Sequence, residues 1–345
     1  MAQTRSSGRN QRMDLYRGAA IYGVVLLHTV SPGAPLSALR ALFRFAVPFF
    51  FLTAGYFSLN AAPRTLGRRA VRTGRLLLYS CLPYLLLGCW LAARREESVL
   101  KWLLSLFRWS NLLDLLAFQT VPLPYAWQLW FLGALFAVYL WWWAVTRGFL
   151  LAGRNIPYRR FALGALALLA VHLLLGEGFA LLKREADTRI LRTALLDGLP
   201  FFTLGVWCAF RREALRRLEI PWHLLILGGG LLSLGEAALA GQQELYLGTL
   251  VTLAGITGRC LRYRRAPAGP LSAALQYCGR ELSLYIFAVH MLILALFREV
   301  SWLAPLKELP WLLFLLTAAL STLAAWGLVR LKHHLSGREN RYENH

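Results

Sequence analysis

The sequence predicts an all-helical protein that crosses a membrane several times. Of its 345 residues, 57% are hydrophobic and only 16% are charged, and the mean hydropathy is +0.48. A soluble domain of this size does not need so much apolar surface, whereas a bundle of lipid-facing helices does. Apolar runs of membrane-spanning length recur along the chain. Ten candidate spans lie at about residues 14–31, 41–60, 76–93, 129–147, 161–176, 194–210, 221–239, 244–262, 276–297 and 310–331.

The distribution of positive charge orients these spans. If both termini are cytoplasmic, 24 of the 38 Lys and Arg residues fall in inner segments and 11 in outer segments. This bias follows the positive-inside rule, so we expect ten helices with both termini in the cytoplasm. It also explains the net charge of +21 without nucleic acid as a partner. We divide the chain into a basic cytoplasmic leader (1–13), one transmembrane domain (14–331) and a polar, disordered cytoplasmic tail (332–345).

Three features outside the spans complete this layout. The first span follows a polar leader and has no small-residue cleavage site, so we expect it to stay as a signal-anchor helix. The segment 94–127 contains "VLKWLLSLFRW", whose apolar and basic residues alternate at helical spacing, and we expect it to lie along the outer membrane surface or to dip into it. The five cysteines show no paired spacing, so we expect neither a disulfide framework nor a metal site.

Polar side chains inside the first span indicate a functional site, because they are costly to bury in a membrane. Arg17 and His28 are eleven residues apart, which is about three turns, so they share one helix face about 16 Å apart. Asp14 joins that face. Two structural interpretations stay open: Asp14 and Arg17 could form an interfacial ion pair, and His28 could be a polar helix end.

The span at 276–297 repeats this arrangement. In the predicted layout both helices run outward, so Arg17 and Arg280 lie near the inner mouth, and His28 and His290 lie in the outer half. Arg280 could instead extend to the inner interface, and His290 could be a packed histidine bonded to a neighbouring helix.

Four motifs resemble those of the membrane acyltransferase-3 family, and they follow the family's order over nearly the whole chain. They are "MDLYRGAAIYGVVLLHTV" with Arg17 and His28, "VPFFFLTAGYF" with Tyr56, "LWFLGALFAVY" with Trp130, and "ELSLYIFAVH" with Ser283, Tyr285 and His290. The chain departs from the family pattern at Ala54, Phe287 and Met291, where Ser, Tyr and Pro are common. It is also similar to the membrane portion of the vancomycin-resistance serine racemases, but we expect no racemase domain because the chain ends shortly after its last helix.

The resemblance implies an integral membrane O-acyltransferase of the bacterial cytoplasmic membrane. It would transfer an acyl group, typically acetyl, from cytoplasmic acyl-coenzyme A to a hydroxyl of an envelope glycan, lipid-linked sugar or related acceptor. Acyl-coenzyme A is then a substrate, and we expect no bound cofactor. The sequence does not indicate an oligomeric state.

Each candidate side chain has a role in this interpretation. A guanidinium binds phosphate oxygens bidentately, so Arg17 would bind or position the donor, with Asp14 orienting it. An imidazole suits a general base, and we assign that role to His28, with a transient acyl-histidine as the alternative. Substrate contacts are predicted for His290, Arg280, Ser283, Tyr285, Tyr56 and Trp130.

Two other functions use the same features. A transporter or flippase of a small molecule or lipid-linked sugar would also place a polar stripe through the bundle, although no inverted repeat is evident. A sensing domain is a third interpretation. Polar residues near the outer span ends are candidates for an acceptor vestibule: His172, Glu177, Asp197 and Glu236.

Overall fold

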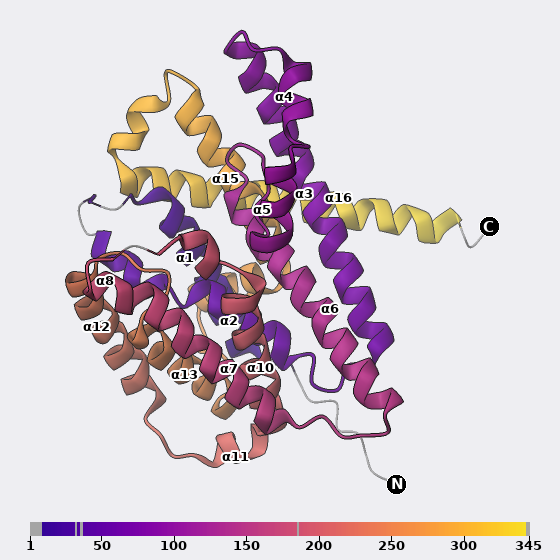
Figure 1. Ribbon diagram of the computed structural model, residues 1–345, viewed down its shortest axis with the longest axis vertical. Helices are drawn as coiled ribbons and strands as arrows, with labels where there is room; N and C mark the ends of the chain where they lie inside the picture. The colour runs from indigo at the N-terminus through magenta and orange to yellow at the C-terminus, as the bar shows by residue number, and fades with distance from the viewer. Residues whose placement is uncertain (1–8, 32, 35–36, 185, 343–345) are drawn as a thin grey trace.

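The chain folds as a bundle of helices (Figure 1). The computed structural model describes residues 9–31, 33–34, 37–184 and 186–342, and within these ranges it contains no strand. The predicted all-helical class is thus confirmed. Seven helical segments are long and apolar enough to cross a membrane. They are Ser37–Tyr56, Pro63–Arg94, Trp127–Leu151, Tyr158–Leu181, Trp222–Ala240, Pro270–Glu299 and Pro310–His334.

Helices occupy all ten of the predicted ranges. The main ones are α1 (Gln11–Thr29), α2 (Ala46–Tyr56), α3 (Pro63–Arg94), α6 (Trp130–Leu151), α7 (Tyr158–Leu173), α10 (Leu199–Phe210), α12 (Trp222–Ala240), α13 (Leu247–Arg262), α15 (Ser283–Glu299) and α16 (Pro310–Tyr342). Of these, α1, α10 and α13 do not belong to the seven long apolar segments. Helix α1 carries charged residues, and α10 and α13 are short.

Shorter segments connect or extend these helices. The α-helical ones are α4 (Val99–Ser105), α5 (Trp109–Phe118), α8 (Phe179–Leu181), α9 (Thr188–Leu191), α11 (Arg212–Arg217) and α14 (Pro270–Tyr277). The 3₁₀ segments are η1 (Ser37–Phe43), η2 (Trp127–Leu129) and η6 (Ala304–Glu308), and the π-helical turns are η3 (Leu174–Gly178), η4 (Ala194–Gly198) and η5 (Cys278–Leu282). Single π turns inside helices often occur at functional sites.

Connections that alternate along the chain gather at opposite ends of the bundle. At one end, Glu244 forms ion pairs with Arg44 at 3.2 Å and with Arg192 at 2.6 Å, which joins three separate connections. At the other end, Arg262 donates to the carbonyl of Arg216 at 2.7 Å. Figure 1 shows α4 at the upper end and α11 at the lower end. This arrangement has the alternation expected of a chain that crosses a membrane repeatedly.

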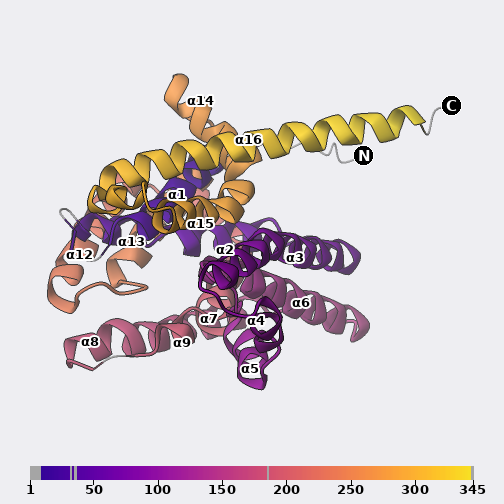
Figure 2. The same ribbon diagram turned by 90° about the horizontal axis from the view of Figure 1, so that it is seen from above.

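Close backbone contact fixes α1 against the helix formed by α14, η5 and α15. A Cβ atom on Gly18 would overlap the carbonyl group of Leu275, and one on Gly279 would overlap the carbonyl oxygen of Asp14. Only glycine permits helices to approach so closely. The two helices that carry the predicted histidines are therefore neighbours, and α16 lies beside them (Figure 2).

The segments outside the spans differ in how they match the sequence. Helices α4 and α5 form within 94–127, and they and the turn between them expose Leu104, Phe107 and Trp109. By contrast, α16 continues to Tyr342, so most of the tail that we expected to be disordered extends a helix. Residues 1–8 of the predicted leader and the end of the tail, 343–345, lie outside the described residues.

Candidate functional site

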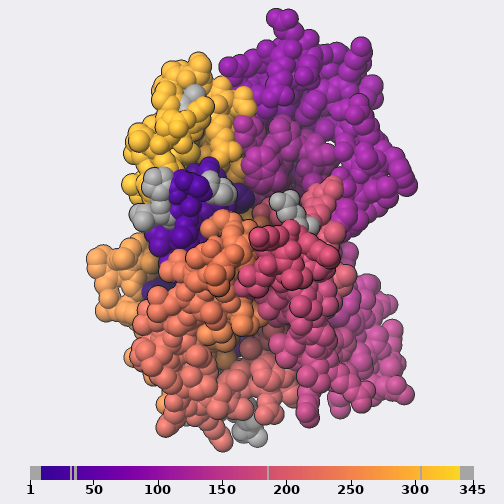
Figure 3. All heavy atoms as spheres, turned by 60° about the vertical axis from the view of Figure 1, so that its left-hand side comes forward, coloured from indigo at the N-terminus to yellow at the C-terminus, as the bar shows by residue number. Residues whose placement is uncertain are grey.

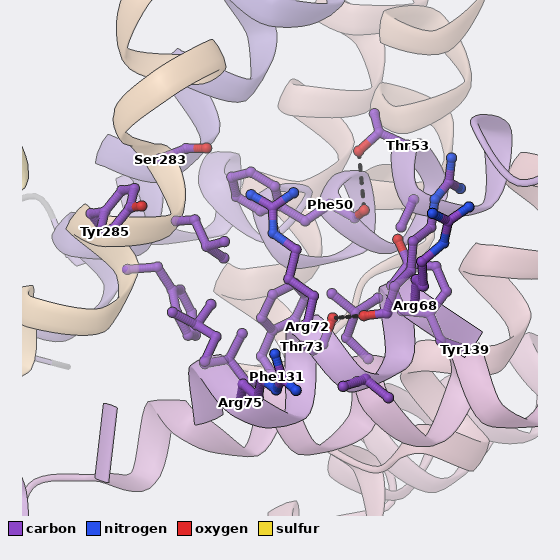
Figure 4. A pocket seen from close by; sticks show the side chains of 18 of the residues that line it. Phe50, Thr53, Arg68, Arg72, Thr73, Arg75, Phe131, Tyr139, Ser283 and Tyr285 are labelled. Carbon is purple, nitrogen blue, oxygen red and sulfur yellow. Dashed lines mark hydrogen bonds between the residues drawn. The ribbon is translucent and has the colours of Figure 1, made fainter. Parts of the chain in front are cut away.

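A cavity of ≈ 980 Å³ opens between α1, α2, α3, α6 and α15. Figure 4 shows the arginines of α3 on one side of this cavity, with Ser283 and Tyr285 across from them. We call it the basic cavity because, among the residues that the structure describes, six cationic side chains and no carboxylate line it. The cationic residues are Arg17, Arg68, Arg69, Arg72, Arg75 and Lys332.

The cavity arginines of α3 have no carboxylate partner among the described residues, so their charges can bind a ligand. Arg69 donates to the carbonyl of Phe57 and to the hydroxyl of Ser58, both at 2.9 Å. Arg68, Arg72 and Arg75 form no ion pair with any residue that the structure describes. A site with this excess of guanidinium groups suits a ligand with several phosphates, each of which binds guanidinium bidentately.

Arg17 of α1 also lines the basic cavity. Its Nε atom is buried and has no hydrogen-bond partner in the described part of the chain. Asp14 does not pair with it as the sequence suggested, because Asp14 binds Arg9 at 2.5 Å. Arg9 precedes the helix and can therefore turn back onto a carboxylate of the first turn. Arg17 is left as a half-buried cation that lines the cavity.

Aromatic side chains close one part of the basic cavity. Phe50, Phe131 and Phe287 line it, and the rings of Phe131 and Phe287 are 5.1 Å apart between centroids. The Phe287 ring also lies 5.9 Å from the ring of His290. Phe287 thus separates the cavity from this histidine.

The structure brings His28 and His290 together behind Phe287, with ring centroids 5.3 Å apart. The Nδ1 atom of His290 lies 2.9 Å from the carbonyl oxygen of Phe287. Since a carbonyl only accepts, Nδ1 carries the proton and Nε2 keeps a lone pair. Nε2 is buried and has no partner among the described residues. His28 is partly exposed, and its carbonyl accepts from Arg298 at 3.4 Å.

One stripe of α15 connects the basic cavity to the histidine pair. Ser283, Phe287 and His290 are four and three residues apart, so they share a helix face. Arg280 does not continue this stripe: it is exposed, does not line the cavity and pairs with Glu281 at 2.7 Å. The π turn η5 contains Arg280 and shifts the helical register just before Ser283, which explains its different direction.

Of the other predicted contact residues, some line the basic cavity and some do not. Ser283 and Tyr285 line the basic cavity, whereas Tyr56 and Trp130 do not. Tyr56 packs edge-on against Phe57, and Trp130 packs against Phe51.

Of the four vestibule candidates, Glu177 and Glu236 accept hydrogen bonds from the first backbone amides of α13. Both carboxylates therefore stabilise a helix N-terminus. His172 and Asp197 are buried and lie in the electrostatic environment of Glu244.

Sequence reasoning missed a partly buried group of charges next to the histidine pair. It consists of Arg40, Arg44, Arg192 and Glu244, and we call it the arginine–glutamate cluster. Burial opposes ionisation of Glu244, but Arg44 and Arg192 outweigh it and hold the pKa of this carboxyl well below its usual range. The same carboxylate raises the pKa of Arg192. The signals in the sequence were the positions of Arg40 and Arg192 in outer segments and of Arg44 inside the predicted span 41–60.

A buried polar chain also supports α15. Tyr84 of α3 donates from its hydroxyl to the carbonyl of Ala288 at 2.8 Å and accepts from Gln128 at 2.6 Å. Ala288 is two residues before His290. These bonds hold the helix at the level of the histidine pair.

A bundle of long apolar helices that encloses a cavity lined by cationic side chains, with a histidine pair beyond Phe287, defines a class of multi-pass membrane proteins. Comparison with known families identifies the class more closely. The chain matches the acyltransferase domain of the acyltransferase-3 family over residues 10–330, and it belongs to this family. No curated protein and no solved structure matches it. Family membership makes it a multi-pass membrane acyltransferase.

Proposed function

We propose that the protein is an O-acyltransferase that moves an acyl group from acyl-coenzyme A to a hydroxyl of an envelope glycan, lipid-linked sugar or related acceptor. The observation that carries the proposal is the position of the histidine pair directly behind the basic cavity. The cavity supplies cations for the donor, and Phe287 lines the cavity on one side and packs against His290 on the other. The acyltransferase family assignment supports the reaction class.

The donor fits the basic cavity by charge and by direction. Coenzyme A carries a diphosphate and a further phosphate, which the arginines of α3 would bind near the mouth. Arg17 would contact the donor further inside. The α1 positions of Arg17 and His28 are about 16 Å apart along the helix, a distance that the extended pantetheine arm would bridge. The thioester would then lie next to the histidines.

The histidine pair would carry the proton transfer. His28, which is partly exposed, takes the proton of the acceptor hydroxyl as its oxygen attacks the thioester carbonyl. The carbon–sulfur bond breaks, and the coenzyme A thiolate receives the proton. His290 would stay neutral and orient its partner. Attack by His28 itself, followed by transfer from an acyl-histidine, uses the same geometry.

The aromatic closure of the basic cavity favours a short acyl group. The rings of Phe131 and Phe287 lie between the cavity and His290, so an acetyl group would reach the histidine more readily than a long acyl chain. We therefore propose acetyl-coenzyme A as the donor.

The proposed topology follows from where this donor is found. Acyl-coenzyme A is cytoplasmic, so the basic cavity would open to the cytoplasm, and the arginine–glutamate cluster would lie near the outer face. This orientation agrees with ten spans, both termini in the cytoplasm and the positive-inside bias of the sequence. We assign the protein to the cytoplasmic membrane of a bacterium.

A transfer assay tests the proposal. Purified full-length protein in proteoliposomes would be given acetyl-coenzyme A labelled in the acetyl group, and free thiol and labelled product would be followed. Thiol release that saturates with donor concentration is expected. Binding of acetyl-coenzyme A without any thiol release, even with envelope extract as a source of acceptor, would contradict the enzymatic function and favour transport.

A further inference from the structure

The arginine–glutamate cluster is built from three connections at the end of the bundle away from the basic cavity's arginines. Glu244 accepts two hydrogen bonds from Arg192, at 2.6 and 2.8 Å, and one from Arg44 at 3.2 Å. Arg40 interacts electrostatically with all three of these residues. The single carboxylate is thus fully engaged by two of the three arginines.

Arg40 is the cation that this carboxylate does not reach. It is only 8% exposed, and its Nη2 atom donates to the carbonyl of Leu27 at 3.2 Å. Its Nε and Nη1 atoms are buried, and neither has a hydrogen-bond partner within the described ranges. Arg44 likewise leaves its buried Nε unmatched there. Buried guanidinium donors are normally satisfied, so these atoms indicate a ligand of opposite charge.

The charges around the cluster do not remove this excess. The other ionisable groups that interact electrostatically with Glu244 include Asp197 of η4, His172 of α7, Tyr246 and His28. His172 donates from Nδ1 to the carbonyl of Leu196 at 3.0 Å and is therefore not a counter-ion. Even with both Glu244 and Asp197 ionised, three guanidinium groups face two carboxylates. An anion would balance the charge.

The position of Arg40 relates the cluster to the chemistry. Leu27, whose carbonyl Arg40 contacts, directly precedes His28, and Arg40, Arg192 and Glu244 all act electrostatically on His28. The Arg192 side chain is 35% exposed and connects the cluster to the surface. In Figure 3 the segments after α1, before η4 and before α13 meet on one face of the molecule. A ligand bound there would approach His28 from the side opposite the basic cavity.

A purely structural role explains only part of this arrangement. An arginine near a helix C-terminus commonly binds the last carbonyls and stabilises the helix. Arg40 does this for α1 with one nitrogen. The other two buried nitrogens of Arg40 and the unmatched Nε of Arg44 are not needed for such a cap.

We propose that Arg40 and Arg44 bind an anionic group of the acyl acceptor, a phosphate or a carboxylate, and thereby place a hydroxyl of the same molecule at His28. The acceptor is then an acidic glycan or a phosphate-bearing lipid-linked sugar. This inference rests on the proposed function, because the bound anion is part of an acyl acceptor only if the protein transfers an acyl group. The anion site itself can be tested without any turnover.

The experiment measures anion binding in detergent by the thermal unfolding of full-length protein, followed by tryptophan fluorescence. The basic cavity also binds anions, so all proteins carry Arg68→Gln and Arg72→Gln. Sodium phosphate and sodium glucuronate are compared with sodium chloride at equal ionic strength. We expect phosphate, glucuronate or both to raise the Tm above the chloride value. Which of them does so distinguishes a phosphate from a carboxylate acceptor.

The added variants decide where the anion binds. Arg40→Gln should weaken the anion affinity at least about tenfold, because it removes charged hydrogen bonds. Arg40→Lys should retain part of the effect, and Arg189→Gln, which changes an exposed arginine paired with Asp187, should retain all of it. Equal stabilisation in the presence and absence of Arg40, no anion-specific stabilisation, or failure of both Arg40 variants to fold would each overturn the inference.

Thiol release from acetyl-coenzyme A by the wild type is measured in parallel. Its absence, with anion binding at Arg40 intact, would contradict the proposed function and leave the anion site standing. Thiol release without an Arg40-dependent anion effect would do the reverse.

Discussion

Arg17→Gln separates donor binding from folding. In the described part of the chain Arg17 has no hydrogen bond or ion pair, because Asp14 binds Arg9 instead. Its replacement therefore removes a desolvated charge without breaking a contact, and the free energy of unfolding should stay the same or rise. A hydrogen bond between charged partners contributes about 1.5–3 kcal/mol, so the affinity for acetyl-coenzyme A should fall about 10- to 150-fold.

The assay combines two measurements on the same detergent-purified protein. Calorimetric titration gives the Kd of acetyl-coenzyme A, and thermal unfolding gives the Tm. Arg64→Gln is the matched control, since Arg64 lies on α3 before the cavity arginines and does not line the basic cavity. Unchanged donor affinity in Arg17→Gln, or a lowered Tm with normal affinity, would refute a donor-binding role for Arg17.

Three further substitutions test other parts of the site. Glu244→Gln should destabilise the protein at neutral pH by about 3–5 kcal/mol, because it leaves the buried Arg44 and the partly exposed Arg192 without their counter-ion. The pKa of Glu244 is depressed in the folded protein, so its contribution exists above the unfolded pKa of about 4.3 and the difference in Tm should shrink as the pH falls below that value. Phe287→Ala should raise thiol release from butyryl-coenzyme A relative to acetyl-coenzyme A by at least about tenfold, because it removes a ring from the path to the histidine pair. Tyr84→Phe should cost about 1–3 kcal/mol of stability and lower kcat without changing the Kd of acetyl-coenzyme A, since it frees α15 from its hydrogen bond near the histidines.

Each of these results has a contrary outcome. A pH-independent difference in Tm for Glu244→Gln would show that the carboxylate is not the group that titrates. Equal loss of activity with every acyl chain length in Phe287→Ala would indicate a packing role instead of a limit on chain length. Weaker donor binding in Tyr84→Phe would place this tyrosine in the donor path.

The local patterns of the sequence predict much of the fold. The lengths of the apolar runs and the bias of positive charge predict ten ranges, and helices occupy all of them. A lipid-facing segment must form its backbone hydrogen bonds internally, so it is helical and has a continuous apolar sequence. Helical periodicity also relates Arg17 to His28, since both lie on one regular helix. The tail is different: its polar composition suggests disorder, yet α16 continues through it to Tyr342.

Contacts between distant segments could not be predicted in this way. The ion pairs of Glu244 join residues 200 and 52 positions apart. No local pattern indicates that Arg44, inside the predicted span 41–60, or Arg192, in an outer segment, pairs with this carboxylate. The predicted position of Arg280 is wrong for a local reason. The π turn η5 breaks the regular helical spacing that was used to align Arg280 with His290, and helix propensity does not reveal such a turn. The closeness of His28 and His290 depends on glycine contacts between two helices that are about 250 residues apart in the chain.

The most direct test of the central claim compares wild type with His28→Ala and His28→Gln in the acetyl-coenzyme A assay, with Kd and thiol release measured on the same preparations. If His28 is the general base, both variants should bind the donor with unchanged Kd and lose about 10²- to 10⁴-fold in thiol release. Thiol release close to the wild-type rate in His28→Gln would contradict a catalytic role for this histidine.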